Sequence, residues 1–248
     1  MKRKFPWAVW LWSIQAATGL LLVLYVVIHT IDNAAILVGT TNFEDMLKLW
    51  HEGIPKILYQ LMVLGLVGVI VVHMLNGIRI ASKPYKEVDV SWRHNIMLKH
   101  SGTMFWFFQV ISGSVIAIFG VWHLIVQHAG EQTTTALQSA SRISPIVFLM
   151  YLAFITGLMF HSFNGVRAII VKLGVMTDRA KESVLVGLVA LAFILFFGMG
   201  VASIGAFLKS HDQAKSSNSR NTSLSNIGGS ETVESAEQNP NIASRTAH

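Results

Sequence analysis

Four histidines lie inside the most apolar stretches of the chain. They are His29, His73, His123 and His161, one in each of four successive apolar segments. Ionisable residues are costly in such surroundings and by default suggest function. For any single histidine, a hydrogen bond to a neighbouring helix is the plainer explanation. Four of them, distributed one per segment, favour a shared role.

The depths of these histidines arrange them as two pairs. His29 and His123 lie near the ends of their segments, whereas His73 and His161 each precede an arginine by six residues, or ~9 Å of helix. Because successive segments run in opposite directions, His29 pairs with His123 near one face and His73 with His161 near the other. Two facing neutral imidazoles can supply both axial ligands of an iron porphyrin. Zinc prefers three or four ligands, with thiolate or carboxylate nearby, and neither depth offers them.

Two sequence patterns repeat around the pairs. The pattern H-x-x-N-G-[IV]-R occurs at residues 73–79 and again at 161–167. The pattern W-x-x-Q-x-x-[ST]-G-x9-H occurs at residues 12–29 and again at 106–123. These matches indicate that the first two apolar segments and the next two are internal duplicates.

Glycines recur at fixed distances from the histidines. Gly77 and Gly165 follow the histidines of their pattern by four residues and share a helix face with them. A flat macrocycle needs such a side-chain-free surface beside its axial ligand. Gly19 and Gly113 precede theirs by ten residues, ~15 Å deeper, near the level of the other pair. Close packing of helix on helix is the alternative explanation for all four.

Long apolar segments must position these residues. Of the 248 residues, 52% are hydrophobic and only 13% are charged, against about 25% charged in soluble domains. Five segments reach the ~20 residues that cross a bilayer. We expect an all-α integral membrane domain over residues 1–208, with a haem-binding four-helix bundle core and a fifth helix. The segments lie near residues 8–31, 55–80, 101–127, 143–171 and 183–208.

The two ends of the chain differ from this apolar body. The basic start at residues 1–4 resembles a signal peptide, but the following apolar run exceeds the about 7–15 residues of a signal core. We therefore expect a retained first helix. Residues 209–248 are polar and contain no aromatic residue. They cannot bury enough apolar surface to fold alone, so we expect a disordered tail.

Charge predicts the orientation in the membrane. All 19 Lys and Arg residues lie outside the five segments or at their edges, concentrated at the N-terminus and in the loops after the second and fourth segments. The positive-inside rule then places the N-terminus in the cytoplasm and the C-terminus outside. This topology explains the net charge of +6 without nucleic acid. The lack of cysteine excludes thiolate-held iron–sulfur clusters and covalent haem attachment in this chain.

These features resemble the di-haem cytochrome b subunit of succinate:menaquinone and menaquinol:fumarate reductases, over roughly residues 5–208. The resemblance implies two haem b groups, the distal one held by the first and third helices and the proximal one by the second and fourth. It implies a menaquinone near the outer face of a bacterial-type inner membrane. It also implies two partners on the cytoplasmic face, a flavoprotein with covalent FAD and an iron–sulfur subunit. A dimer of the whole complex is compatible with the resemblance.

Further residues carry over by motif. The resemblance implies that Gln15, Trp106 and Lys172 contact the propionates of the proximal haem. Arg79 and Arg167 mark the inner membrane boundary, as interfacial anchors do. One of these two arginines is also expected near the propionates.

The resemblance extends to one loop, and the chain departs from the family at one position. Residues 50–53 resemble the quinone-site stretch, which makes Glu52 the candidate quinone-site acid; an ordinary solvated loop residue is the alternative. Some members carry a glutamate two residues before the proximal-haem histidine of the fourth helix, used for transmembrane proton compensation. This chain has Met159 there. We therefore expect electrogenic quinone chemistry, or another proton route.

Two other functions fit parts of the pattern. The cytochrome b subunit of a nitrate reductase, formate dehydrogenase or hydrogenase also holds two haems, but often with more than one ligand on a helix. A transporter or channel with a histidine relay would show broken helices and a midplane site. The even distribution of the four histidines over four helices and two layers favours a cytochrome b of the succinate dehydrogenase and fumarate reductase type. Dicarboxylate chemistry would then belong to the flavoprotein partner.

Overall fold

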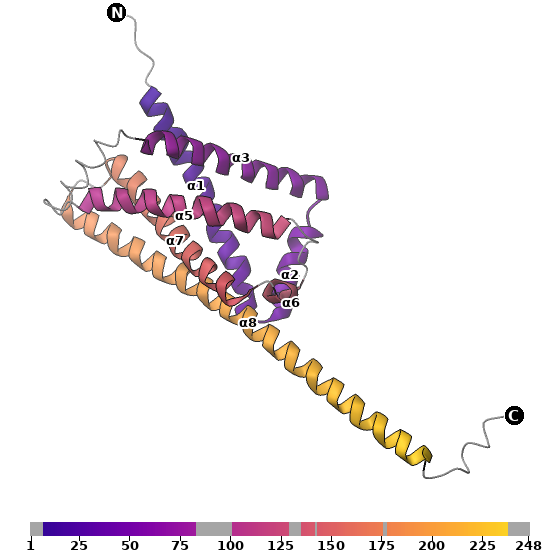
Figure 1. Ribbon diagram of the computed structural model, residues 1–248. Helices are drawn as coiled ribbons and strands as arrows, with labels where there is room; N and C mark the ends of the chain where they lie inside the picture. The colour runs from indigo at the N-terminus through magenta and orange to yellow at the C-terminus, as the bar shows by residue number, and fades with distance from the viewer. Residues whose placement is uncertain (1–6, 83–100, 129–134, 142, 176–177, 238–248) are drawn as a thin grey trace, which may run out of the picture.

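In the computed structural model of this chain, every regular element of the described residues is a helix (Figure 1). The structure describes residues 7–82, 101–128, 135–141, 143–175 and 178–237. The long helices are α1 (Trp7–Ala34), α3 (Lys56–Ala81), α5 (Ser101–His128), α7 (Pro145–Lys172) and α8 (Arg179–Glu237). The predicted all-α architecture is confirmed.

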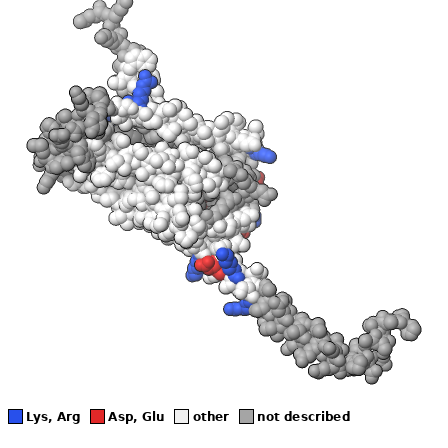
Figure 2. Space-filling view, in the orientation of Figure 1, with Lys and Arg blue, Asp and Glu red and all other residues white. Residues whose placement is uncertain are grey.

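Within the described ranges, five helical stretches are long and apolar enough to cross a membrane, as the sequence predicts. They are Trp7–Leu37, Lys56–Ala81, Met104–Val126, Pro145–Lys172 and Ala180–Arg220. Large apolar side chains point outward along them; Leu64 and Ile118 are each 67% exposed. Figure 2 shows a flank of the bundle on which Lys, Arg, Asp and Glu are confined to the ends. Such a surface suits hydrocarbon rather than water, and the chain is a multi-pass membrane protein.

Local sequence signals set the ends of α7 and α8. Ser144 accepts a hydrogen bond from a backbone N–H of the first turn of α7, and Pro145 begins the helix. Gly174, with φ of +72°, follows its last turn. Asp178 caps α8 by accepting the backbone N–H of Lys181 at 2.9 Å. This bond holds the pKa of Asp178 below its usual range, so the cap is present above the ordinary pKa and lost as pH falls through the lowered value.

The bundle is built from two helix pairs, as the internal duplication predicts. Helix α3 packs on α1, and α5 packs on α7. Helix α1 joins the pairs through its contact with α7, and α8 packs on both α7 and α1. Among the described residues, α3 and α5 do not form a close helix pair. Space is therefore left between the two pairs.

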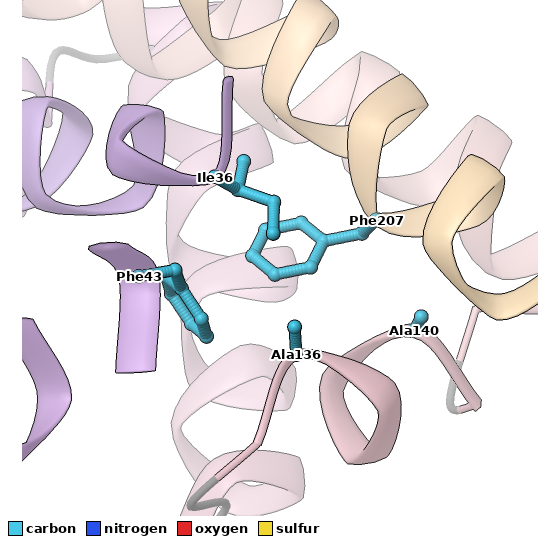
Figure 3. Packing of buried hydrophobic residues seen from close by; sticks show 5 residues of the cluster. All are labelled: Ile36, Phe43, Ala136, Ala140 and Phe207. Carbon is cyan, nitrogen blue, oxygen red and sulfur yellow. The ribbon is translucent and has the colours of Figure 1, made fainter. Parts of the chain in front are cut away.

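Short helices that the sequence analysis did not predict close one end of the bundle. They are η1 (Ala35–Leu37), α2 (Thr40–His51) and α6 (Ala136–Ser141). Their apolar side chains meet Phe207 of α8 in one buried cluster (Figure 3), formed by Ile36, Phe43, Ala136, Ala140 and Phe207. The Phe43 and Phe207 rings meet edge to face with centroids 4.8 Å apart. We call this the cap end of the bundle and the opposite end the basal end.

Helix α8 continues well past the bundle (Figure 1). It runs to Glu237, so the change in composition near Lys209 does not end the helix. The disordered tail expected from residue 209 stays a prediction. Residues 215–220 are exposed, and the lack of an independent fold in this segment stays a prediction; residues 238–248 lie outside the described part.

Candidate cofactor site

A cavity of about 1820 Å³ lies between the two helix pairs. It reaches from Lys172 at the basal end to Trp50 at the cap end. Its volume is nearly twice the ~1000 Å³ upper end of sites for single small ligands. All four predicted histidines and the four predicted glycines line it. The cavity therefore has room for two large groups in series.

The four histidine rings lie in two pairs inside the cavity. The ring centroids of His73 and His161 are 6.2 Å apart, with an interplanar angle of 82°. Those of His29 and His123 are 6.3 Å apart, at 68°. A metal–imidazole nitrogen bond is about 2 Å long and the ring centre lies about 1 Å behind that nitrogen, so two ligands across one metal hold their centroids ~6 Å apart. Both separations fit one metal between two rings.

Hydrogen bonds determine the tautomer of His73. The Thr18 hydroxyl donates to the Ile14 carbonyl at 2.7 Å, so its oxygen accepts the Nδ1–H of His73 at 3.0 Å. Nε2 then carries the lone pair, and the amide of Gln15 donates to it at 3.2 Å. This is the tautomer that a metal ligand bound through Nε2 requires. An iron at that nitrogen would take the place of the Gln15 amide.

His161 is also held through its Nδ1, on the other helix pair. Its Nδ1 lies 3.1 Å from the backbone carbonyl oxygen of Gln109, which can only accept, so Nδ1 carries the proton. Ser112, whose hydroxyl donates to a carbonyl of its own helix, lies 3.3 Å from the same nitrogen. Both basal histidines therefore present an Nε2 lone pair. The Thr18 and Ser112 contacts were missed in the sequence, although both residues stand in its repeated pattern.

An amide–amide hydrogen bond ties each helix pair together. Asn76 donates to Oε1 of Gln15 at 3.0 Å and to a backbone carbonyl of α1 at 2.8 Å. Asn164 donates to Oε1 of Gln109 at 2.7 Å and to a backbone carbonyl of α5 at 3.3 Å. Both asparagines are buried. The N of the repeated H-x-x-N-G motif thus joins helices, as polar side chains do in membranes.

Gly19 and Gly113 face the basal histidine rings. A Cβ on Gly19 would lie 3.1 Å from Cε1 of His73, and a Cβ on Gly113 would lie 3.1 Å from Cε1 of His161. Both glycines are therefore at the level of the basal pair, the level that their spacing predicts. Their immediate neighbour in the structure is an imidazole ring, which approaches the backbone because no side chain intervenes.

Gly77 and Gly165 make room for the glutamine amides. A Cβ at these positions would lie 3.3 Å from Nε2 of Gln15 and 3.4 Å from Nε2 of Gln109, respectively. Both glycines also line the cavity. The close neighbour beside each is a side chain of the paired helix, and the predicted place of these two glycines beside a haem stays a prediction.

Arg167 brings a buried positive charge to the basal end of the cavity. It is 7% exposed, lies 4.3 Å over the Phe105 ring and pairs with Glu182 of α8 at 2.9 Å. Its Nε and the Oδ1 of Asn164 are buried without a hydrogen-bond partner among the described residues. Such groups are costly unless something else binds them. A donor of this kind suits an anionic group inside the cavity.

The other residues expected near the propionates divide into two groups. Gln15, Trp106 and Lys172 line the cavity, and Nζ of Lys172 lies 5.8 Å from the centre of the Trp12 ring. Arg79 is exposed and is not among the cavity-lining residues. Of the two candidate arginines, the structure thus brings Arg167 to the cavity.

The cap-end histidines have a different set of neighbours. The side-chain amide of Asn33 donates to Nε2 of His29 at 3.3 Å. The Tyr25 ring stacks on His29 with centroids 5.4 Å apart. Nδ1 of His123 lies 3.3 Å from the Tyr151 hydroxyl. Each ring is thus supported by residues one turn away or on the neighbouring helix.

Glu52 does not line the cavity. It is exposed, at the C-terminal end of α2, and is not among the cavity-lining residues. Trp50, from the same stretch, does line the cavity and donates its indole N–H to Asp32 at 3.0 Å. Asp32 was not singled out in the sequence, although it stands one helical turn beyond His29.

The chain matches one family of membrane subunits over most of its length. A family model described as the succinate dehydrogenase/fumarate reductase transmembrane subunit matches residues 2–82 and 89–201. The chain belongs to this family. The succinate dehydrogenase/fumarate reductase resemblance predicted from the histidines is therefore confirmed, in preference to the other cytochrome b families.

Two relatives of this transmembrane subunit are both described as fumarate reductase cytochrome b subunits. The one from Helicobacter pylori is 22% identical over 203 residues, which cover 79% of each chain. The one from Wolinella succinogenes is 24% identical over 208 residues, which cover 79% of this chain and 80% of the relative. The similarity thus extends over most of this chain and of each relative.

Proposed function

We propose that this chain is the cytochrome b membrane anchor of a succinate dehydrogenase or fumarate reductase complex. In this role it passes electrons between a membrane menaquinone and an iron–sulfur subunit through two bis-histidine b haems. The observation that carries the proposal is the pair of histidine couples, 6.2 and 6.3 Å between centroids, in one cavity. The family and the names of the two relatives support the same function.

The chain's own residues would hold the haems as follows. His73 and His161 would ligate the basal, proximal haem, and His29 and His123 the distal one. The Nδ1–H bonds of the basal histidines fix their rings and orient the Nε2 lone pairs. Bound there, each haem supplies a one-electron carrier within the apolar layer.

The basal end carries the groups that would hold propionates. Arg167 and Lys172 supply positive charge, and Gln15 and Trp106 supply neutral N–H donors on the same cavity wall. The orphaned Nε of Arg167 is a donor available to such a carboxylate. Arg79, exposed outside the cavity, would act as an interfacial anchor.

The basal end would face the cytoplasm and the partner subunits. The positively charged N-terminus and the loops after α3 and α7 support this orientation in the inner membrane. A flavoprotein with FAD and an iron–sulfur subunit would dock on this side, next to the proximal haem. The cap end would lie outside, near the quinone.

Met159 bears on the route of protons. It is only 2% exposed and cannot exchange a proton. Protons released or taken up at the cap end would then not be compensated through this position, and turnover would be electrogenic. In reconstituted vesicles, quinone-linked turnover should depend on the membrane potential; turnover that is independent of potential would contradict this part of the proposal.

A haem count tests the proposed function directly. Pyridine haemochrome against protein, on the purified complex, should give two b haems per chain, and a redox titration of the same sample should show two steps. One haem would leave one histidine pair without the proposed role. No haem in a well-folded complex would refute the proposal.

A further inference from the structure

The cavity contains only two carboxylates among its described lining residues, one at each end. Glu182 lies at the basal end and is paired with Arg167 at 2.9 Å. Asp32 lies at the cap end, on α1 one turn beyond His29. Glu52, the acid indicated by sequence resemblance, is exposed and outside this lining. Asp32 is therefore the carboxylate that a ligand at the cap end would meet.

The surroundings of Asp32 suit the head group of a quinone. The indole N–H of Trp50 donates to its Oδ2 at 3.0 Å and so binds one carboxylate oxygen from α2. The Tyr25 ring, stacked on His29, and the Tyr59 ring of α3 line the same end. Aromatic rings and hydroxyls of this kind are groups that a flat ring with oxygen substituents can contact.

Apolar side chains continue from this end along α3. Met62, Leu66 and Ile70 line the cavity between the cap end and the basal histidines. The proposed distal haem would cover the deeper part of this wall, so a lipid-like ligand with a polar ring would meet the Asp32 carboxylate and the apolar wall nearest the cap end, at Met62.

Resting on the proposed function, we propose that Asp32, positioned by Trp50, is the residue that exchanges protons with the quinone at the cap end. In quinol oxidation, the two O–H bonds of the hydroquinone break, and two protons and two electrons leave. The Asp32 carboxylate accepts the protons in turn and releases them to the aqueous phase at the cap end. The two electrons reduce fumarate to succinate at the partner subunits, which take up two protons there; succinate oxidation reverses every transfer.

The test compares D32N with E52Q in the whole purified complex. The donor is 2,3-dimethyl-1,4-naphthoquinol and the acceptor is fumarate. D32N should lower kcat at least about tenfold with KM changed less than about twofold, because the amide cannot accept a proton while the ring site remains. E52Q should stay within about twofold of the wild type. D32E, which restores a carboxylate, should recover part of the lost kcat.

Two further measurements separate this inference from the proposed function. Fumarate reduction by a reduced viologen, which donates directly to the water-soluble partners, should be unchanged in D32N, and the haem count should stay at two. W50F keeps an aromatic ring but removes the hydrogen-bond donor to Asp32, and should lower kcat more than about twofold with KM and the haem count unchanged, because the carboxylate is then held less firmly for proton transfer.

Each remaining outcome decides the question. Wild-type quinol activity in D32N, with two haems bound, would overturn the role of Asp32 and leave the proposed function standing. A loss confined to E52Q would return the role to Glu52. Loss of haem together with activity in D32N, without recovery in D32E, would assign Asp32 a structural role. A wild-type complex without haem would instead overturn the proposed function.

Discussion

The two helix pairs carry the same motif in unequal surroundings. In both, an asparagine binds a glutamine across the pair, and a histidine Nδ1 lies beside a hydroxyl of the partner helix. Helix α7 is enclosed by α5, α1 and α8, whereas α3 packs on α1 and α2. Accordingly α7 buries Met159, Ser162, Asn164 and Arg167, but α3 buries only Asn76.

The difference shows how one motif acquires two roles. The arginine that ends H-x-x-N-G-[IV]-R is exposed at Arg79 but buried at Arg167, because α8 supplies Glu182 beside the second one. Duplication therefore preserved the contacts inside each pair. The fifth helix, which has no duplicate, made the two pairs unequal.

The largest expected effects come from the histidines and test whether the pairs share their ligands. H73A and H161A should each lower the haem content from two to one per chain and remove the same redox step, because both rings would hold one iron. H29A and H123A should remove the other step. Pyridine haemochrome and redox titration measure this. H211A, outside the cavity on α8, is the control and should keep both haems; different steps lost from H73A and H161A would break the pairing.

Next in size is the comparison of the two arginines. R167Q should destabilise the protein by about 1–2 kcal/mol, because it leaves Glu182 without its partner; the cost stays below that of a fully buried pair since the Glu182 side chain is 44% exposed. R79Q should change stability by less than about 0.5 kcal/mol. Unfolding of both variants in the same detergent measures the difference. Equal losses of stability would mean that the burial of Arg167 against α8 does not distinguish it from Arg79.

The Asn–Gln hydrogen bonds should contribute less to stability than Arg167, and by equal amounts in the two helix pairs. N76A and N164A each remove a side-chain donor from two hydrogen bonds, for a loss of about 1 kcal/mol. Double-mutant cycles with Q15A and Q109A should yield coupling energies of about 0.6 kcal/mol each. Coupling in only one pair would show that the Asn–Gln hydrogen bond stabilises that helix pair and not the other.

The smallest effects are expected from two glycines. G19A and G113A would place a Cβ 3.1 Å from the Cε1 atoms of His73 and His161. The rings must then shift by a few tenths of an ångström. Both haems should stay bound, with a changed midpoint potential for the proximal step alone. G187A is the matched control, because a Cβ there meets nothing within 4 Å. A change in the distal redox step alone would contradict the placement of Gly19 and Gly113 beside the proximal haem.

Much of the site could be predicted because it depends on helix geometry. A rise of ~1.5 Å per residue converts the positions of four histidines into two depths without any tertiary information. The cap end could not be found in this way. Helix α2 has apolar Phe43, Met46, Leu47 and Trp50 at helical spacing, but a helix this short is stable only when its apolar face is buried. That burial depends on α6 and Phe207, which are distant in the chain.

The sequence by itself determined the five spans and the layering of the histidines, because a bilayer demands long apolar helices and each ionisable residue in them stands out. Only the tertiary structure decided which of two identical motif positions carries a buried arginine, and which acid lines the cavity. Arg167 and Asp32 owe their surroundings to Glu182 on α8 and Trp50 on α2. Contacts between side chains far apart in the chain depend on how the helices pack, and the spacing of residues along one helix does not contain that information.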